Sequence, residues 1–183
     1  AREDHRMIAA LEAAGVDCYP EYTPSSTLMT LEYKTDDVDK RSLYVTDTAG
    51  SIPPTQLDGL EARAVVVGTS LRGEVGLDFF EAMRRRDAVI LAADVQGFVR
   101  VLRDQTLVYE PWDEMAAVLQ HVDILKSDMV EAEFLTGETD IEKAARFYAN
   151  LGPKEIVLTH RDGVLIHAGG RDYAYTFHSA SMD

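Results

Sequence analysis

Short apolar runs alternate with amphipathic segments from residue 64 onward. The runs ARAVVVGTS, AVILAADVQG, VDILK and EIVLTH have the length and residue content of buried strands. Apolar residues at helical spacing predict helices between them, at 73–86, about 113–120, around 131–135 and 140–152. Two last strands, VLIHA and AYTFH, are joined by Gly169-Gly170. This order predicts an α/β fold with a mostly parallel sheet and helices on both faces.

The first 48 residues follow a different pattern. A helix over 3–14, stopped by Gly15, leads into a predicted strand at 16–20. The runs LMTLEY and RSLYVT are rich in Thr, Tyr, Val and Leu and flank a polar turn, which predicts a hairpin. We therefore expect residues 18–48 to form a small β lid within one domain that covers residues 1–183.

Composition narrows the classes of partner. Hydrophobic residues make up 46% of the chain, which is enough for a packed core. The 18 basic and 32 acidic residues give a net charge of -14, and such a surface repels phosphate backbones and anionic lipids. We expect neither nucleic acid nor membrane as a partner. An anionic substrate would need a local cation, a helix N-terminus or a bound metal.

Cysteine usage and the first residues bear on the compartment. Cys18 is the only cysteine, so neither a disulfide within the chain nor a paired-cysteine metal site can form. No run approaches the roughly 18 apolar residues of a membrane span, and AREDHRMIAA lacks the apolar core of a signal peptide. These features predict a cytoplasmic protein.

Polar segments follow three of the predicted parallel strands: GTSLRG, DVQGFVR and KSDMVEAE. Because ligands of open α/β sheets bind at the carboxyl ends of the strands, these segments predict a site. Asp94, Gln96 and Arg100 are candidates for substrate contact; alternatively, Asp94 caps a helix on which Arg100 lies solvated. Asp128 and Glu131 are spaced for a capping box, and the same two carboxylates could hold Mg²⁺ through waters.

The segment after EIVL is a weaker candidate. Thr159 and Gly163 could approach a phosphate, although most such pairs are plain hairpins. His160 and Arg161 suggest anion contact, but a lone histidine is more often exposed polar surface. The hallmark motifs of dinucleotide-binding dehydrogenases, P-loop kinases, zinc proteases and serine hydrolases do not occur in the chain.

The segment VDILKSDMVEAEFLTG resembles one that characterises the ribokinase-like, PfkB-type carbohydrate kinases. In that family an Asn and a Glu three residues later organise Mg²⁺ and phosphate; here Asp128 stands in place of the Asn and Glu131 matches the Glu. The resemblance extends over nearly the whole chain and implies a ribokinase-like three-layer α/β/α fold with a β lid. It also implies ATP and Mg²⁺ as cofactors and Lys126, Thr159 and Gly163 as nucleotide-binding residues.

Other segments refine the resemblance. DVQGFVR is similar to the branch that contains myo-inositol kinases, which places Asp94, Gln96 and Arg100 beside the phosphate acceptor. The turn at Thr159 is shorter than the family's phosphate-binding turn and carries His160-Arg161 where a glycine is usual. Since the lid forms a dimer contact in many members, the family implies a homodimer through the corresponding region, 27–48.

Two family features are missing from the sequence. The first strand with its glycine pair is absent before Ala1, and the G-A-G-D-type segment that supplies the general base does not occur. The catalytic residues are therefore unknown, and we expect the base beyond Asp183. On this interpretation the chain is the central portion of a kinase, incomplete at both ends, and is inactive by itself.

The sequence thus predicts an ATP-dependent, Mg²⁺-dependent kinase of a sugar, polyol or nucleoside. Two alternatives remain open. One is a nucleoside kinase of the cytidine type, for which Tyr22 or Tyr44 in the lid could stack on a base. The other is a sugar-binding or regulatory protein without catalysis, which Asp128 and the altered turn would permit.

Overall fold

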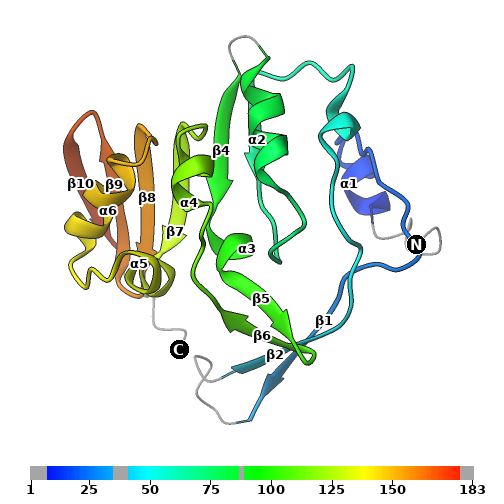
Figure 1. Cartoon of the computed structure of the whole chain (residues 1–183), viewed down its shortest axis with the longest axis horizontal. Helices are drawn as coiled ribbons and strands as arrows, with labels where there is room; N and C mark the ends of the chain where they lie inside the picture. Colours follow the sequence, from blue (N-terminus) through cyan, green and yellow to red (C-terminus); the bar gives the residue numbers. More distant parts are fainter. Residues whose placement is uncertain (1–7, 35–40, 87–88, 178–183) are drawn as a thin grey trace.

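A six-stranded sheet forms the body of the protein in the computed structural model, which describes residues 8–34, 41–86 and 89–177 (Figure 1). Its strand order is β10-β9-β8-β7-β4-β3. The strands are β3 (Ala64–Val67), β4 (Ile90–Asp94), β7 (Ile124–Asp128), β8 (Glu155–His160), β9 (Gly163–Ala168) and β10 (Arg171–Thr176). The first four run parallel and the last two pair antiparallel, as predicted from the alternating pattern.

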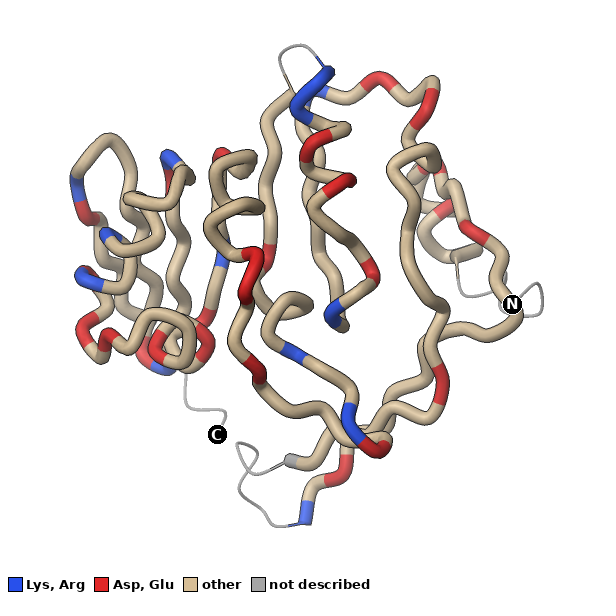
Figure 2. Tube along the Cα trace, viewed as in Figure 1, with Lys and Arg blue, Asp and Glu red and all other residues tan. Residues whose placement is uncertain are grey.

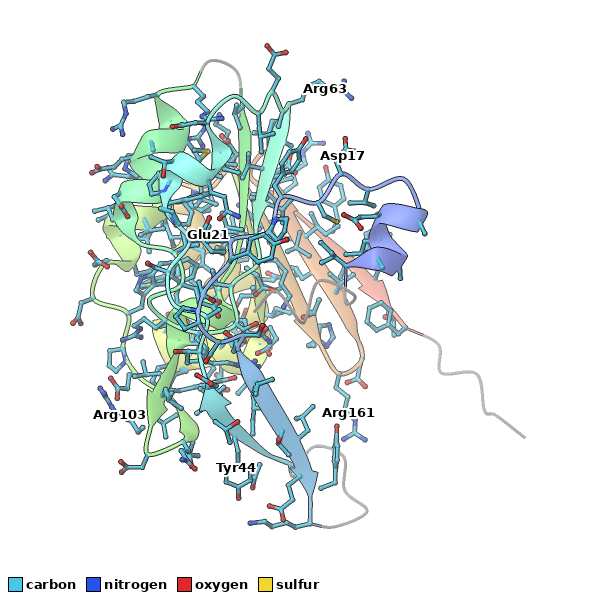
Figure 3. All side chains as sticks on the ribbon, turned by 90° about the vertical axis from the view of Figure 1, so that its right-hand side faces the viewer. Asp17, Glu21, Tyr44, Arg63, Arg103 and Arg161 are labelled. Carbon is cyan, nitrogen blue, oxygen red and sulfur yellow. The ribbon has the colours of Figure 1, made fainter. Side chains whose placement is uncertain are left out.

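Helices separate the strands in the predicted order. They are α2 (Leu77–Arg84), α4 (Met115–Leu119), α5 (Met129–Thr136) and α6 (Ile141–Ala149), with a single turn α3 (Gln96–Val99) after β4. Helix α5 packs against β7 and β8, and α6 against β8 and β9. In Figure 3 helix α2 lies on one side of the sheet, and the short α1 (Ala9–Ala13), which has no buried residue, lies on the other.

The core lies under the helices. Leu91, Leu125, Ile156 and Leu158 alternate along neighbouring strands and are fully buried against it, together with Phe80. Phe79 and Trp112 are also buried. On the opposite face of the sheet, Val66 of β3 is 76% exposed and Ile90 of β4 is 49% exposed. Within the described ranges, one face of the sheet is therefore buried under helices, and the other face is only partly covered.

The lid is a second sheet with order β1-β2-β6-β5. Its strands β1 (Leu28–Tyr33) and β2 (Arg41–Asp47) form the predicted hairpin. Strands β5 (Arg100–Arg103) and β6 (Thr106–Tyr109) form a second hairpin that the sequence analysis missed. Asp104 and Gln105 both have positive φ, 45° and 65°, as a two-residue turn of primed type requires. Without the usual Asn-Gly or Asp-Gly, this turn is hard to predict.

The N-terminal predictions hold only in part. Gly15 stops α1 with a φ of 85°, but the helix is described only from Ala9 because residues 1–7 lie outside the described ranges. The strand predicted at 16–20 is wrong: these residues have no regular structure, since no described strand runs beside them. The polar turn at 35–40 and the end of the chain, with His178 and Asp183, also lie outside the described residues.

Candidate functional site

The junction of β7 and α5 places two carboxylates at the carboxyl edge of the sheet. Asp128 is the N-cap of α5, and its Oδ1 accepts a hydrogen bond from the Glu131 amide at 2.8 Å. Glu131 Oε2 in turn accepts one from the Asp128 amide at 3.0 Å. Gly137 ends the helix with a φ of 73°. The predicted capping box is therefore confirmed, and the helix ends in a left-handed glycine cap.

Glu131 is the more constrained of the two carboxylates. Its side chain is fully buried, and its Oε1 has no hydrogen-bond partner among the described residues. Burial raises the pKa of Glu131 above its usual value, and the nearby charges of Asp128 and Asp94 act in the same direction. The amide of Asp128 and the charge of Lys126 oppose that rise only in part. Glu131 is thus a buried carboxyl group with one unsatisfied oxygen, held behind Asp128.

A second pair joins β4 to β7. Asp94 and Lys126 face each other in the parallel register, and Lys126 Nζ lies 3.1 Å from Asp94 Oδ2. Asp94 Oδ1 also accepts the amide of Gln96 at 3.0 Å, but the N-cap of α3 is Val95, so Asp94 is not the helix cap that the alternative interpretation predicted. Arg100 does not lie on a helix, however, because it begins β5. This ion pair links the predicted substrate side of the site to the predicted phosphate side.

Gln96 and Arg100 contact each other. With the Gln96 amide oriented so that its oxygen faces the guanidinium, that oxygen accepts from both terminal nitrogens of Arg100, at 2.8 and 3.1 Å. This pair fixes Arg100 where the lid joins the sheet. The candidate substrate residues Asp94, Gln96 and Arg100 therefore form one connected chain of polar contacts.

A cavity of about 730 Å³ lies between the lid and the carboxyl edge of the sheet. Its lining comes from the lid, from the start of α5 and from the end of β8, and consists of Leu43, Arg100, Leu107, Tyr109, Asp128, Met129, Val130, Thr159, His160 and Arg161. Three of the predicted site residues, Arg100, Asp128 and Thr159, line it. Asp94, Lys126, Gln96, Glu131 and Gly163 do not, although Gln96 and Glu131 make hydrogen bonds to the lining residues Arg100 and Asp128.

The presence of glycine at position 163 has a structural explanation. A Cβ atom at this position would lie 2.1 Å from the Tyr175 carbonyl oxygen on β10, so only glycine fits. Thr159 lies in register with Asp128 on the neighbouring strand, and its hydroxyl makes a long contact of 3.5 Å with the Ser127 carbonyl. Of the predicted Thr159–Gly163 pair, the threonine lines the cavity and the glycine permits the close approach of β10.

Tyr109 is a site residue that the sequence analysis missed. It lies on β6 opposite Arg100, lines the cavity and packs its ring edge against Phe134 of α5, with 5.6 Å between ring centroids. Burial and the charges of Glu131 and Asp128 raise its pKa. The alternation of RVLR and TLVY was the available signal for a strand, but only the folded lid brings Tyr109 to the cavity.

The residues at the cavity suit a magnesium–phosphate complex better than a metal held by protein alone. No group of three or more His, Cys, Asp or Glu side chains within the described ranges could enclose a metal ion. Asp128 faces the cavity with one oxygen used by the helix cap, so its second oxygen remains for a ligand. Mg²⁺ commonly takes one or two carboxylates and completes its shell with water and phosphate oxygens.

No helix of the described part is long and apolar enough to cross a membrane.

Comparison with known proteins gives matches among solved structures only. Neither a family model nor a curated protein matches the chain. A sulfate complex of a pyrophosphate-dependent kinase of the ribokinase family is 32% identical over the whole chain, with a TM-score of 0.90. A complex of such a kinase with a pyrophosphate analogue and myo-inositol is 31% identical over the whole chain, with a TM-score of 0.86.

A more distant match has the same fold. Ribokinase of Arabidopsis thaliana, complexed with ribose and ATP, is 16% identical over 85% of this chain, with a TM-score of 0.63. The chain spans 64% and 63% of the lengths of the two pyrophosphate-dependent kinase chains and 50% of the length of the plant ribokinase chain.

Proposed function

Because this chain belongs to the ribokinase-like, PfkB-type kinase family, we propose that the protein transfers a phosphoryl group to a hydroxyl of a sugar or polyol. The predicted fold class, a ribokinase-like three-layer α/β/α arrangement with a β lid, is confirmed by the same matches. Since the chain spans less than two thirds of those relatives, the activity proposed here is that of the full-length protein.

The observation that carries the proposal is the cavity under the lid. It combines apolar lid residues with Arg100, Asp128 and Thr159 at the carboxyl edge of the sheet. Such a mixture suits a small molecule with many hydroxyl groups, since the lid excludes water while the polar edge orients the reacting group. The relative that binds myo-inositol supports a cyclic polyol as the acceptor.

Magnesium is the proposed metal. We assign Asp128 to hold it from the cavity side, and Glu131 to position Asp128 through the capping box from behind. When bound, the ion would neutralise charge on the phosphate oxygens of the donor. The full burial of Glu131 makes it a positioning residue rather than a direct ligand from the cavity.

The transfer step needs mainly positioning and charge. The acceptor oxygen attacks the terminal phosphorus of the donor, the bond from that phosphorus to the bridging oxygen breaks, and the hydroxyl proton passes to a base. We propose that a carboxylate outside residues 1–183 is this base. Arg100, held by Gln96, would orient the acceptor or a phosphate oxygen, and Lys126 would balance the charge of Asp94.

The donor is a phosphoanhydride. The resemblance in sequence favours ATP, with Thr159 contacting its phosphates from the cavity lining. Lys126 would then act through its ion pair rather than by direct contact, and Gly163 would act by allowing β10 to pack closely on β9.

The lid is also the proposed dimer contact. Leu28, Leu31 and Tyr33 of β1 are each more than half exposed, and a second copy of the lid would cover them. Light scattering of the full-length protein tests this, because Leu31→Asp should convert a dimer into a monomer while Glu32→Gln should not.

A phosphorylation screen tests the proposed function. The full-length protein would be supplied with Mg²⁺, either ATP or pyrophosphate, and myo-inositol, ribose, fructose, cytidine or adenosine. Turnover of a polyol or sugar, lost in Asp128→Ala, supports the proposal. Preference for cytidine or adenosine would instead support a nucleoside kinase, and binding of a sugar without any turnover would support the non-catalytic alternative.

A further inference from the structure

The turn between β8 and β9 carries two basic side chains to the cavity. β8 ends at His160 and β9 begins at Gly163, so Arg161 and Asp162 form the turn. His160 and Arg161 are exposed, and both line the cavity together with Leu43 of the lid. In Figure 3 the labelled Arg161 lies at the end of this hairpin, on the side of the lid strands. The turn therefore lines one side of the cavity.

Both side chains have donors free for a ligand. His160 Nδ1 accepts a hydrogen bond from the Asp162 amide at 3.3 Å, so the neutral ring carries its proton on Nε2. That N–H remains available as a donor. No hydrogen bond or ion pair engages the Arg161 guanidinium among the residues that the structure describes, whereas Arg84, Arg86 and Arg103 are all paired.

The cavity is a local exception in an acidic protein. Acidic positions are spread along the whole trace in Figure 2, in keeping with the net charge of -14. The cavity lining, by contrast, contains Arg100, His160 and Arg161 against the single carboxylate of Asp128. This reversal favours an anion with several charges, and Asp128 would approach such an anion through a bound cation.

From these contacts we propose that the phosphoryl donor is inorganic pyrophosphate, and that Arg161 binds it together with His160. The inference rests on the proposed function and narrows its donor. Pyrophosphate has no base or ribose, so its binding free energy must come from charge-assisted hydrogen bonds, and the planar fork of arginine matches two phosphate oxygens at once. Two relatives that are 31–32% identical use pyrophosphate, which supports the assignment.

The transfer step balances with this donor. The acceptor hydroxyl oxygen forms a bond to one phosphorus of pyrophosphate, and the bond from that phosphorus to the bridging oxygen breaks. Orthophosphate leaves with the bridging oxygen, and the hydroxyl proton passes to the base of the proposed function. Arg161 and His160 would contact the phosphate that leaves, where negative charge develops.

A nucleotide donor would require a different set of contacts. Phe177 is 58% exposed and lies beside the same turn, because its amide donates to the Asp162 carbonyl at 2.8 Å. Its ring could stack on a base. Phe177 therefore distinguishes the two donors: a nucleotide needs a stacking surface, and pyrophosphate does not.

Steady-state kinetics of the full-length protein test the inference. With pyrophosphate as donor, Arg161→Ala should raise the KM for pyrophosphate about 10-fold or more and leave the KM for the acceptor unchanged. The matched control is Arg171→Ala, at the opposite end of β9 and outside the cavity lining, and it should have no effect. Phe177→Ala should also leave the KM for pyrophosphate unchanged. Use of ATP but not pyrophosphate, with a raised KM for ATP in Phe177→Ala, would overturn the inference.

A binding measurement separates this inference from the proposed function. Methylenediphosphonate, which cannot transfer its phosphoryl group, should bind the wild type in a calorimetric titration with Mg²⁺, and about 10-fold more weakly to Arg161→Ala. If no acceptor is turned over but this Arg161-dependent binding is found, the proposed function fails and the anion site stands. Binding that is equal in Arg161→Ala and wild type would refute the site whatever the turnover.

Discussion

The two ends of the parallel strands carry similar charged residues but satisfy them differently. At the amino end of β7, Asp123 Oδ2 pairs with Arg84 at 2.6 Å and accepts the Leu91 amide at 2.9 Å, while Oδ1 lies 3.4 Å from Lys154. At the carboxyl end, Asp128 uses one oxygen for the helix cap, and Glu131 Oε1 has no partner in the described structure. The saturated Asp123 stabilises the fold, whereas the second oxygen of Asp128 is left for a ligand.

The pKa values express the same difference. Burial alone would raise the pKa of Asp123, but the Leu91 amide and the charge of Arg84 outweigh it and lower that pKa. At Glu131 burial prevails and the pKa is raised. The amino edge of the sheet thus stabilises the charged form of its carboxylate, whereas burial at the carboxyl edge destabilises the charged form of Glu131 unless a cation is bound nearby.

The largest expected effect is at Asp128. Asp128→Ala should lower kcat/KM at least 100-fold, because it removes the cavity carboxylate, and should cost about 1 kcal/mol of stability through loss of the cap. Asp128→Asn is the control, since it keeps an oxygen ligand and a good N-cap. Kinetics and urea unfolding of both variants check this. Equal kinetics in all three proteins would show that the carboxyl edge has no role in transfer.

Glu131→Gln should have the next largest effect. We expect kcat/KM to fall about 10- to 100-fold, the range for residues that orient a metal ligand. Stability at neutral pH should not fall, because the variant removes a buried charge and keeps an acceptor for the Asp128 amide. A thermal unfolding midpoint well below that of the wild type would contradict this view of Glu131.

Asp123→Ala should give the opposite result at the other edge. The variant leaves the Arg84 guanidinium and the Leu91 amide without their partner and should lose about 2 kcal/mol in urea unfolding. The kinetic constants of the folded protein should match the wild type, since Asp123 is far from the cavity along β7. A selective loss of kcat would show that the two edges are coupled.

The pH dependence of unfolding should separate the edges by sign. Asp123 has a lowered pKa, so its contribution is present above 3.8, the usual value, and is lost as the pH falls through the lower folded value. Glu131 has a raised pKa, so its contribution is present below 4.5 and is lost as the pH rises through the folded value. Asp123→Asn should therefore flatten the acid side of the profile, and Glu131→Gln should remove the decline above pH 4.5. Unchanged profiles would contradict these shifts.

Substitution of one lysine at each edge of the sheet should give the smallest effects. Lys154 is 82% exposed at the amino edge, and Lys154→Ala should change stability by less than about 0.5 kcal/mol with no kinetic effect. Lys126 is 38% exposed at the carboxyl edge. Lys126→Ala should raise the KM for the acceptor several-fold, because it leaves the charge of Asp94 without its partner. Parallel kinetic measurements on the two variants decide whether the Lys126–Asp94 pair is functional.

Local patterns in the sequence were enough to predict the sheet and one part of the site. Strand alternation and the Asp128–Glu131 spacing depend on neighbours in the chain, so β3, β4, β7, β8 and the capping box were predicted. The second lid hairpin was missed because Gln105 rarely adopts positive φ. Tyr109 and Leu43 were missed as site residues because their place in the cavity depends on the pairing of distant hairpins.

That pairing also sets an order of assembly. β2 meets β6 through Tyr44 and Thr106, which are separated by about 60 residues, so closing this loop has a larger entropic cost than forming either hairpin. We expect each hairpin to form within microseconds, and the two to join only after β4 and α3 have folded and brought β5 into place. The lid sheet that covers the cavity would then be the last part of the protein to fold and the first to open in mild denaturant.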